Sequence, residues 1–130
     1  MSIEQIHQQH QALERVTAQL QRKIQGLPFD YEAIDTLILD LIQQHRRHFI
    51  YEEMQMAASQ YPDYQAHKQA HTACLSDMKL AFEEWQMSRE FKPMREFFSV
   101  ALANRLSEHM DHMDAGVVEH LKGYKPQSAG

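Results

Sequence analysis

The segment HFIYEEM at residues 48–54 carries a histidine and a glutamate four positions apart, and HKQAH at residues 67–71 carries two histidines with the same spacing. Residues four apart in an α-helix lie on one face, one above the other. His48 and Glu52 would therefore share one helix face, and His67 and His71 would share another. Neutral imidazole and carboxylate groups are common ligands of iron, zinc and manganese. The two segments predict helices that meet around a metal site.

The composition of the 130-residue chain favours a single helical domain. Glycine and proline occur only four times each, and no segment shows the alternation of apolar and polar residues that is typical of a strand. Hydrophobic residues make up 43% of the chain and charged residues 24%, which is typical of a globular protein rather than a disordered one. We expect an all-α domain at residues 1–122 and a C-terminal tail at residues 123–130.

The net charge of −5 argues against nucleic acid or an anionic membrane surface as the main partner. The N-terminus has neither the cationic start nor the apolar run of a signal peptide. The apolar stretches are too short to span a bilayer. Because Cys74 is the single cysteine, an intramolecular disulfide is excluded. We therefore expect a cytoplasmic protein with no membrane span.

Apolar residues recur every three or four positions in four segments, at residues 2–25, 30–60, 64–87 and 93–122. Gly26 follows the first segment, and Asp30 is suited to cap the second. Residues 61–63, with a central proline, separate the second segment from the third. Pro93 is suited to the first position of the fourth helix. Short connections between long helices predict an up-down-up-down antiparallel four-helix bundle.

Several positions on the predicted buried faces are polar. Leaving such groups buried without partners would cost roughly 1–3 kcal/mol each, so something should bind them. They fall early in the first and third helices and late in the second and fourth, which places all of them toward one end of an antiparallel bundle. Five histidines and two carboxylates are too many for one zinc ion and fit two metals better. These residues are His10, His48, Glu52, His67, His71, His109 and Asp114.

In this order, these residues resemble the ligand set of the hemerythrin family, in particular the single-domain bacteriohemerythrins. The resemblance covers nearly the whole chain, and its parts together are far more specific than any part alone. The matching elements are His10, His48-Phe49-x-x-Glu52-Glu53, Tyr61-Pro62, His67-x-x-x-His71 and His109-x-x-x-x-Asp114.

The resemblance implies a non-haem di-iron centre in which Glu52 and Asp114 bridge two irons together with an oxo or hydroxo group. One iron would bind three histidines and the other two, which would leave a position open for dioxygen. The histidines of the first iron would be His67, His71 and His109, and those of the second His10 and His48.

The function implied by the resemblance is reversible dioxygen binding, for carrying, storage or delivery, without enzyme activity. One alternative is a sensor of oxygen, redox state or iron that acts through an unidentified protein partner. Another is a di-iron detoxification enzyme, although this chain lacks the glutamate-rich ligand pattern of ferritin-like enzymes.

Two ligand positions have neighbours that could replace them. His7 is one turn before His10 but lies off the apolar face, so we prefer His10. His112 could replace His109, but only His109 has the family's spacing to Asp114. At about 100° per residue, five residues place His109 and Asp114 about 140° apart, on opposite edges of the buried face.

Three other polar residues have less specific predictions. His45 lies on the buried face one turn before His48, and we expect it either to bond to a ligand or to be partly exposed. Glu53 follows Glu52 directly, so we expect it to face away from the metals. We expect His120 to be on the surface.

Overall fold

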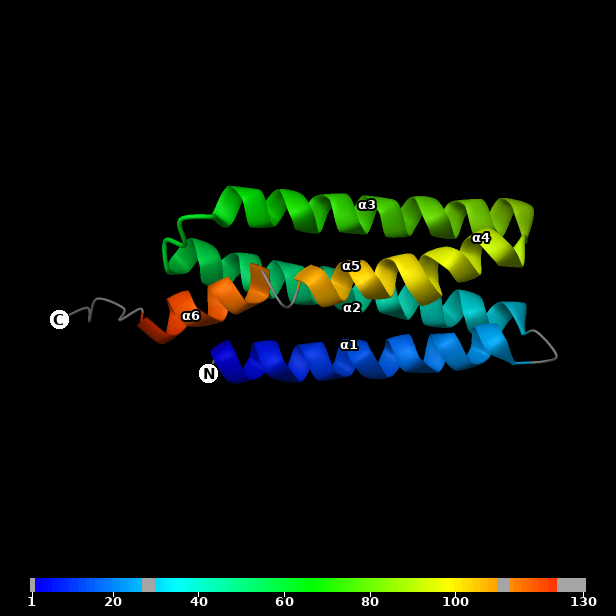
Figure 1. Ribbon diagram of the computed structural model, residues 1–130, viewed down its shortest axis with the longest axis horizontal. Helices are drawn as coiled ribbons and strands as arrows, with labels where there is room; N and C mark the ends of the chain where they lie inside the picture. The colour runs from blue at the N-terminus through cyan, green and yellow to red at the C-terminus, as the bar shows by residue number, and fades with distance from the viewer. Residues whose placement is uncertain (1, 27–29, 110–112, 124–130) are drawn as a thin grey trace.

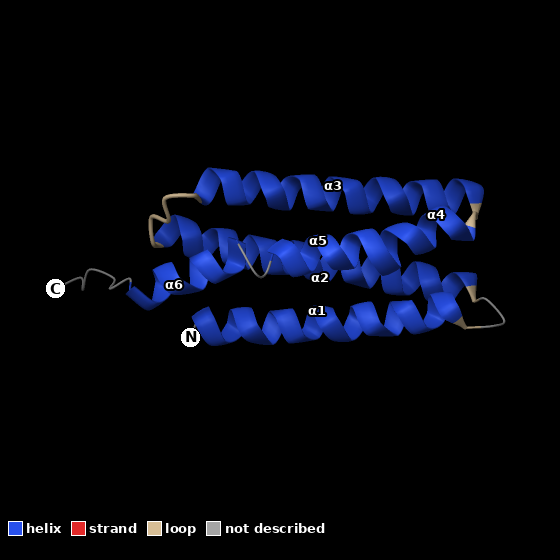
Figure 2. Ribbon diagram, in the orientation of Figure 1, coloured by secondary structure: helices blue, strands red, loops and turns tan. Residues whose placement is uncertain are grey.

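The computed structural model describes residues 2–26, 30–109 and 113–123 (Figure 2). These residues form helices and contain no strand, which confirms the all-α prediction. The long helices are α1 (Ser2–Gln25), α2 (Tyr31–Ala58) and α3 (Tyr64–Ser88). Their bounds agree with the periodic segments of the sequence to within two residues. Among the described residues, no helix combines the length and apolar content needed to cross a membrane.

The last part of the chain is divided into shorter helical segments. They are α4 (Phe91–Arg95), the π-helix η1 (Glu96–Ala101), α5 (Leu102–His109) and α6 (Ala115–Gly123). The described residues of the predicted helix over residues 93–122 are helical, with a π-helical stretch at Glu96–Ala101, and residues 110–112 lie outside the described residues. A π-helix places more residues in each turn than an α-helix, which shifts the face that later residues present. The predicted tail, after residue 123, lies outside the described residues.

One detail of the fourth segment differs from the sequence prediction. Pro93 lies at the third position of α4, which begins at Phe91, and not at the first position of the helix. Within the same segment Ala101 is exposed and Leu102 is buried. The start of this helix is a boundary that apolar spacing alone does not fix.

Successive segments reverse direction along the molecule (Figure 1). α1 packs against α2, α2 against α3, and α3 against α4, while α6 returns to contact α1. Segments from the two ends of the chain therefore lie side by side. This arrangement places the start of α1, the end of α2, the start of α3, the end of α5 and the start of α6 toward the same end of the molecule (Figure 1).

The buried apolar residues form two separate clusters. The larger one is built around Leu20, Ile38, Met78, Trp85 and Phe98, together with other buried residues from α1 to α5. The smaller cluster consists of Ile6, Met56 and Val117, with tyrosines packed against it. The polar positions predicted from the sequence fall between the two clusters along the helices, so packed apolar side chains lie on both sides of them.

Away from these polar positions, Asp35 ties the start of α2 to the end of α3. Trp85 donates its indole N–H to Asp35 at 2.7 Å, and the guanidinium of Arg89 donates to both carboxylate oxygens at 2.8 Å. Arg89 adopts the left-handed conformation that ends α3, with a φ of 54°. The hydrogen bonds from Arg89, reinforced by the one from Trp85, hold the pKa of Asp35 below its usual value despite partial burial.

Candidate metal centre

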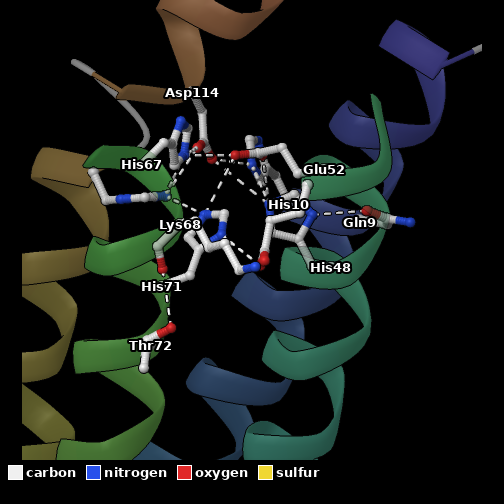
Figure 3. A network of polar contacts seen from close by, with 11 residues as sticks. Gln9, His10, His48, Glu52, His67, Lys68, His71, Thr72 and Asp114 are labelled. Carbon is white, nitrogen blue, oxygen red and sulfur yellow. Dashed lines mark hydrogen bonds and ion pairs between the residues drawn. The ribbon is translucent and has the colours of Figure 1, made fainter. Parts of the chain in front are cut away.

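Among the described residues, seven polar side chains converge between α1, α2, α3, the end of α5 and the residue just before α6 (Figure 3). Five of them are fully buried, while His10 and His109 keep 15% and 11% of their side chains exposed. All five histidines take part through the same ring atom, Nε2. The structure therefore brings together every site residue predicted from the sequence: His10, His48, Glu52, His67, His71, His109 and Asp114.

The histidines form two groups. Nε2 of His109 lies 3.1 Å from Nε2 of His67 and 3.1 Å from Nε2 of His71. In the other group, Nε2 of His10 lies 3.1 Å from Nε2 of His48. The division into three and two histidines is the one that the resemblance implied.

Each carboxylate presents one oxygen to each histidine group. Oε1 of Glu52 lies 2.7 Å from Nε2 of His67, and Oε2 lies 3.2 Å from Nε2 of His48. Oδ1 of Asp114 lies 2.9 Å from Nε2 of His109, and Oδ2 lies 2.8 Å from Nε2 of His10. Glu52 and Asp114 are therefore placed to be shared between two cations.

The donor atoms fit metal ions better than they fit one another. Two nitrogens that bind one metal at about 2.1 Å, at a right angle, lie about 3.0 Å apart, close to the spacing within each histidine group. A neutral imidazole has a single N–H, so several clustered Nε2 atoms cannot all be satisfied by hydrogen bonds. Both carboxylate oxygens of Glu52 are buried without a well-directed hydrogen bond, although His67 is close to one of them. Positive ions between the groups would satisfy these atoms.

Without metal, the carboxylates of the cluster favour their negative form and His48 and His67 favour their positive form. Burial disfavours the charged carboxylate of Glu52, but contacts with histidines, including His48 and His67, lower its pKa to about 2. Burial likewise opposes charge on His48 and His67, yet Asp114 and Glu52 raise the pKa of each imidazole to about 9. The pKa of Asp114 is also held well below its usual value by surrounding histidines, against the effect of burial. Protons and metal ions therefore compete for these nitrogens.

Two residues outside the ligand set orient its histidines. Nδ1 of His48 lies 2.7 Å from Oε1 of Gln9, and Nδ1 of His71 lies 3.1 Å from Oε2 of Glu53. Such hydrogen bonds fix the tautomer that leaves Nε2 free for a metal. Glu53 was predicted only to face away from the metals, and its contact with the outer side of the His71 ring was not predicted. The contact of Gln9 with His48 was not predicted. The only indication of it in the sequence is that Gln9 directly precedes His10.

Phe49 covers the site from the side of the larger apolar cluster. Its ring stacks on His71 with the ring centroids 3.9 Å apart and the planes 7° from parallel. It also contacts the rings of His45, His48 and His109. Phe49 therefore limits the movement of several histidines at once.

His45 differs from both predictions made for it. It is fully buried, and its Nδ1 donates to the carbonyl of Leu41 at 2.8 Å rather than bonding to a ligand residue. His7 is exposed, in agreement with the choice of His10. His120 is partly buried, not simply on the surface, and its Nε2 lies 2.8 Å from the carbonyl oxygen of Ser59.

His109 and Asp114 reach the site from positions five apart. Nε2 of His109, at the end of α5, lies 2.9 Å from Oδ1 of Asp114, just before α6. The angle predicted between the two positions stays a prediction, because residues 110–112 lie outside the described residues. His112, the alternative to His109, lies outside the described residues.

The family of the chain follows from a comparison with known protein families. A model of the hemerythrin HHE cation binding domain matches residues 1–121. The chain belongs to the hemerythrin family. No curated protein and no solved structure matches it significantly. The match covers all seven converging residues of this hemerythrin domain and confirms the family predicted from the sequence.

A cavity of about 280 Å³ reaches the metal site of this hemerythrin domain between α1, α2 and α5. His10, His48 and Asp114 form part of its inner wall. Much of the remaining lining is apolar, including Leu13, Ala18, Phe49, Ala103 and Leu106. The cavity offers a small molecule an approach to the group that holds two histidines.

Proposed function

We propose that this hemerythrin-family protein is a non-haem di-iron protein that binds dioxygen reversibly, for carrying, storage or delivery. The observation that carries the proposal is the pair of histidine groups that share both carboxylates. Two irons would be bridged by those carboxylates and a solvent-derived group. The proposed ligands are His67, His71 and His109 for one iron, His10 and His48 for the other, and Glu52 and Asp114 for both.

The unequal histidine groups support a dioxygen site beside His10 and His48. Three histidines would nearly complete one iron's coordination, whereas two would leave the other iron open. The cavity lies along the two-histidine group and is lined by Leu13, Phe49 and Leu106. Bound iron would supply the electrons that reversible dioxygen binding needs. The apolar wall would exclude water and hinder proton entry, which favours binding and release over turnover.

We propose a binding protein rather than an enzyme because the donor set is rich in histidine. Di-iron enzymes of the ferritin type place four glutamates at the site, whereas the described residues place two carboxylates at this one. We also propose that the fold is an antiparallel four-helix bundle. Its fourth helix would be the interrupted line of α4, η1, α5 and α6.

The test combines metal analysis with spectroscopy on the purified chain. We expect two irons per chain, and a visible absorption spectrum of the reduced protein that changes with dioxygen and reverts when dioxygen is removed. His10→Ala should lower the iron content and abolish the spectral change. His7→Ala, one turn away and exposed, is the matched control and should behave as the unmodified protein. A single metal per chain, or no response to dioxygen, contradicts the proposal.

The same experiment separates the alternatives. Continuous consumption of a reductant and a substrate would favour a detoxification enzyme. A change in oligomeric state or in partner binding on exposure to dioxygen, redox change or iron would favour a sensor. The cytoplasmic location stays a proposal, which cell fractionation would test.

A further inference from the structure

The two histidine groups of the site differ in the number of donor atoms that they offer a metal ion. The three-histidine group consists of His67, His71 and His109, and with one oxygen from each shared carboxylate it brings five donor atoms within 4.8 Å of one another. The two-histidine group consists of His10 and His48 and brings together four, including the same two carboxylates. Metal affinity rises with the number and charge of the ligands, so the three-histidine group should bind an ion more tightly.

The groups also differ in the side chain that contacts each of them from outside. Nδ1 of His71 lies 3.1 Å from a carboxylate oxygen of Glu53. Nδ1 of His48 instead lies 2.7 Å from the amide oxygen of Gln9 (Figure 3). When Nε2 binds a metal, Nδ1 carries the hydrogen, so both side chains accept a hydrogen bond. A charged acceptor makes the stronger bond and the more basic ligand, which again favours the three-histidine group.

Access to the two groups is unequal as well. Both histidines of the two-histidine group line the cavity between α1, α2 and α5, whereas His109 is the one described residue of the other group that does. His10 keeps 15% of its side chain exposed, compared with 1% for His67 and for His71. A chelator or an exchanging ion would therefore meet the two-histidine group first.

We propose that the two groups fill in order, the three-histidine group first, and that Gln9 is the positioning residue that keeps the second ion weakly held. This inference rests on the proposed function, in which the two-histidine group is the place of dioxygen binding. A chain with a single ion would hold it in the other group and would not bind dioxygen. Dioxygen binding would then follow the supply of metal, with the second ion as the switch.

The first test uses the unmodified full chain loaded with two zinc ions and labelled with ¹⁵N on histidine. A chelator is added in steps, and the ring nitrogen resonances are followed. When one zinc per chain is left, we expect Nε2 of His10 and His48 to have lost the large shift of metal ligation, and that of the three-histidine group to keep it. The affinity for the ion that leaves first should be roughly 10- to 100-fold lower.

The second test replaces the amide of Gln9 by a carboxylate of the same shape. Gln9→Glu should raise the affinity for the ion that leaves first about 10-fold and leave the affinity for the other ion unchanged. Gln8→Glu makes the same change of charge at the neighbouring exposed position and should alter neither affinity. A residue that only supported the fold would not strengthen the binding of one ion and spare the other.

Equal affinities for the two zinc ions, or loss of the first ion from the three-histidine group, overturns the order of filling. Equal effects of Gln9→Glu and Gln8→Glu overturn the role of Gln9. If Gln9→Glu fails to fold, the measurement on the unmodified chain still decides the order. Neither iron nor dioxygen is used, so a chain that holds two zinc ions equally well leaves the proposed dioxygen function standing.

Discussion

The carboxylate of Glu53 lies 3.1 Å from Nδ1 of His71, on the side of the ring opposite the metal site. The imidazole N–H donates to the carboxylate, which orients the ring and makes Nε2 a stronger ligand. We expect Glu53→Ala to weaken metal binding roughly 10- to 100-fold. Glu53→Gln keeps a hydrogen-bond acceptor without the negative charge, so it should lose less metal affinity than Glu53→Ala. Competition against a chelator of known affinity measures both variants.

The control for Glu53 is Glu83→Gln, which removes an exposed carboxylate on α3. It alters the net charge by the same amount as Glu53→Gln and should leave metal affinity unchanged. If Glu53→Gln and Glu83→Gln lower metal affinity equally, Glu53 acts through the net charge of the protein and not through its hydrogen bond with His71.

A methyl group at Gly116 would collide with Tyr61. An added Cβ would lie 2.7 Å from the tyrosine hydroxyl oxygen, which is too close for non-bonded atoms. Overpacking of this kind costs about 1–3 kcal/mol, so Gly116→Ala should lower the free energy of unfolding by that amount. Tyr61→Phe removes the hydroxyl, and the double variant should recover most of the loss. Chemical denaturation of the four proteins measures the coupling.

Gly123→Ala provides the control for Gly116. Both glycines lie in α6, but a Cβ at Gly123 would meet no atom within 4 Å. Alanine there should be neutral or slightly stabilising, because it has a better helix propensity. A loss of stability equal to that of Gly116→Ala would contradict the steric explanation.

The bond between Asp35 and Arg89 should make stability depend on pH in acid. The folded-state pKa of Asp35 lies below its usual value, so the unfolded chain takes up the proton first as the pH falls. The contribution is therefore complete above about pH 4 and is lost as the pH falls through the folded-state pKa. We expect Asp35→Asn to cost about 1 kcal/mol at pH 6. The difference should shrink below pH 4.

Urea denaturation of Asp35→Asn and the unmodified protein at several pH values measures this effect. Asp40→Asn, an exposed change on the same helix, is the comparison. A stability difference for Asp35→Asn that stays constant down to pH 2 would show that the carboxylate charge contributes nothing.

Removal of metal should lower the melting temperature. The bound metal stabilises the folded chain by about 2.7 kcal/mol when free metal exceeds the dissociation constant 100-fold. For a chain of this size that is roughly 10 °C. Calorimetry of the chelated and reloaded protein tests this, with His67→Ala as the variant whose melting should respond less to metal. A melting temperature independent of metal contradicts ligation by these residues.

The long helices and the convergence of the seven polar side chains could be predicted because their signals are local and periodic. Ile34, Ile38 and Leu41 repeat at helical spacing, and His48 and Glu52 continue the same face. Their burial could therefore be predicted from the spacing, and all five are buried. The π-helical stretch at Glu96–Ala101 could not be predicted in this way. Apolar residues are dense enough there to fit more than one helical phase, and packing against the other helices decides between them.

The residues that contact the converging histidines from outside were harder to predict than the converging residues themselves. Glu53 and Gln9 each neighbour a ligand in sequence, which on an ideal helix points them away from it. Their long side chains instead reach the Nδ1 atoms of His71 and His48, which belong to other helices. Such contacts depend on ring rotation and on the distance between helices, and neither is encoded in residue spacing.

The contact between His10 and Asp114 joins positions 104 residues apart in the chain. In the terms of polymer physics, a metal held by both would act as a cross-link. Closing a loop of about 100 residues lowers the conformational entropy of the unfolded chain, which stabilises the folded state by about 4.7 kcal/mol. This effect is otherwise associated with disulfides. The chain forms no such bond within itself, having one cysteine. A centre that keeps its metal while other contacts loosen would hold the two ends of the domain together.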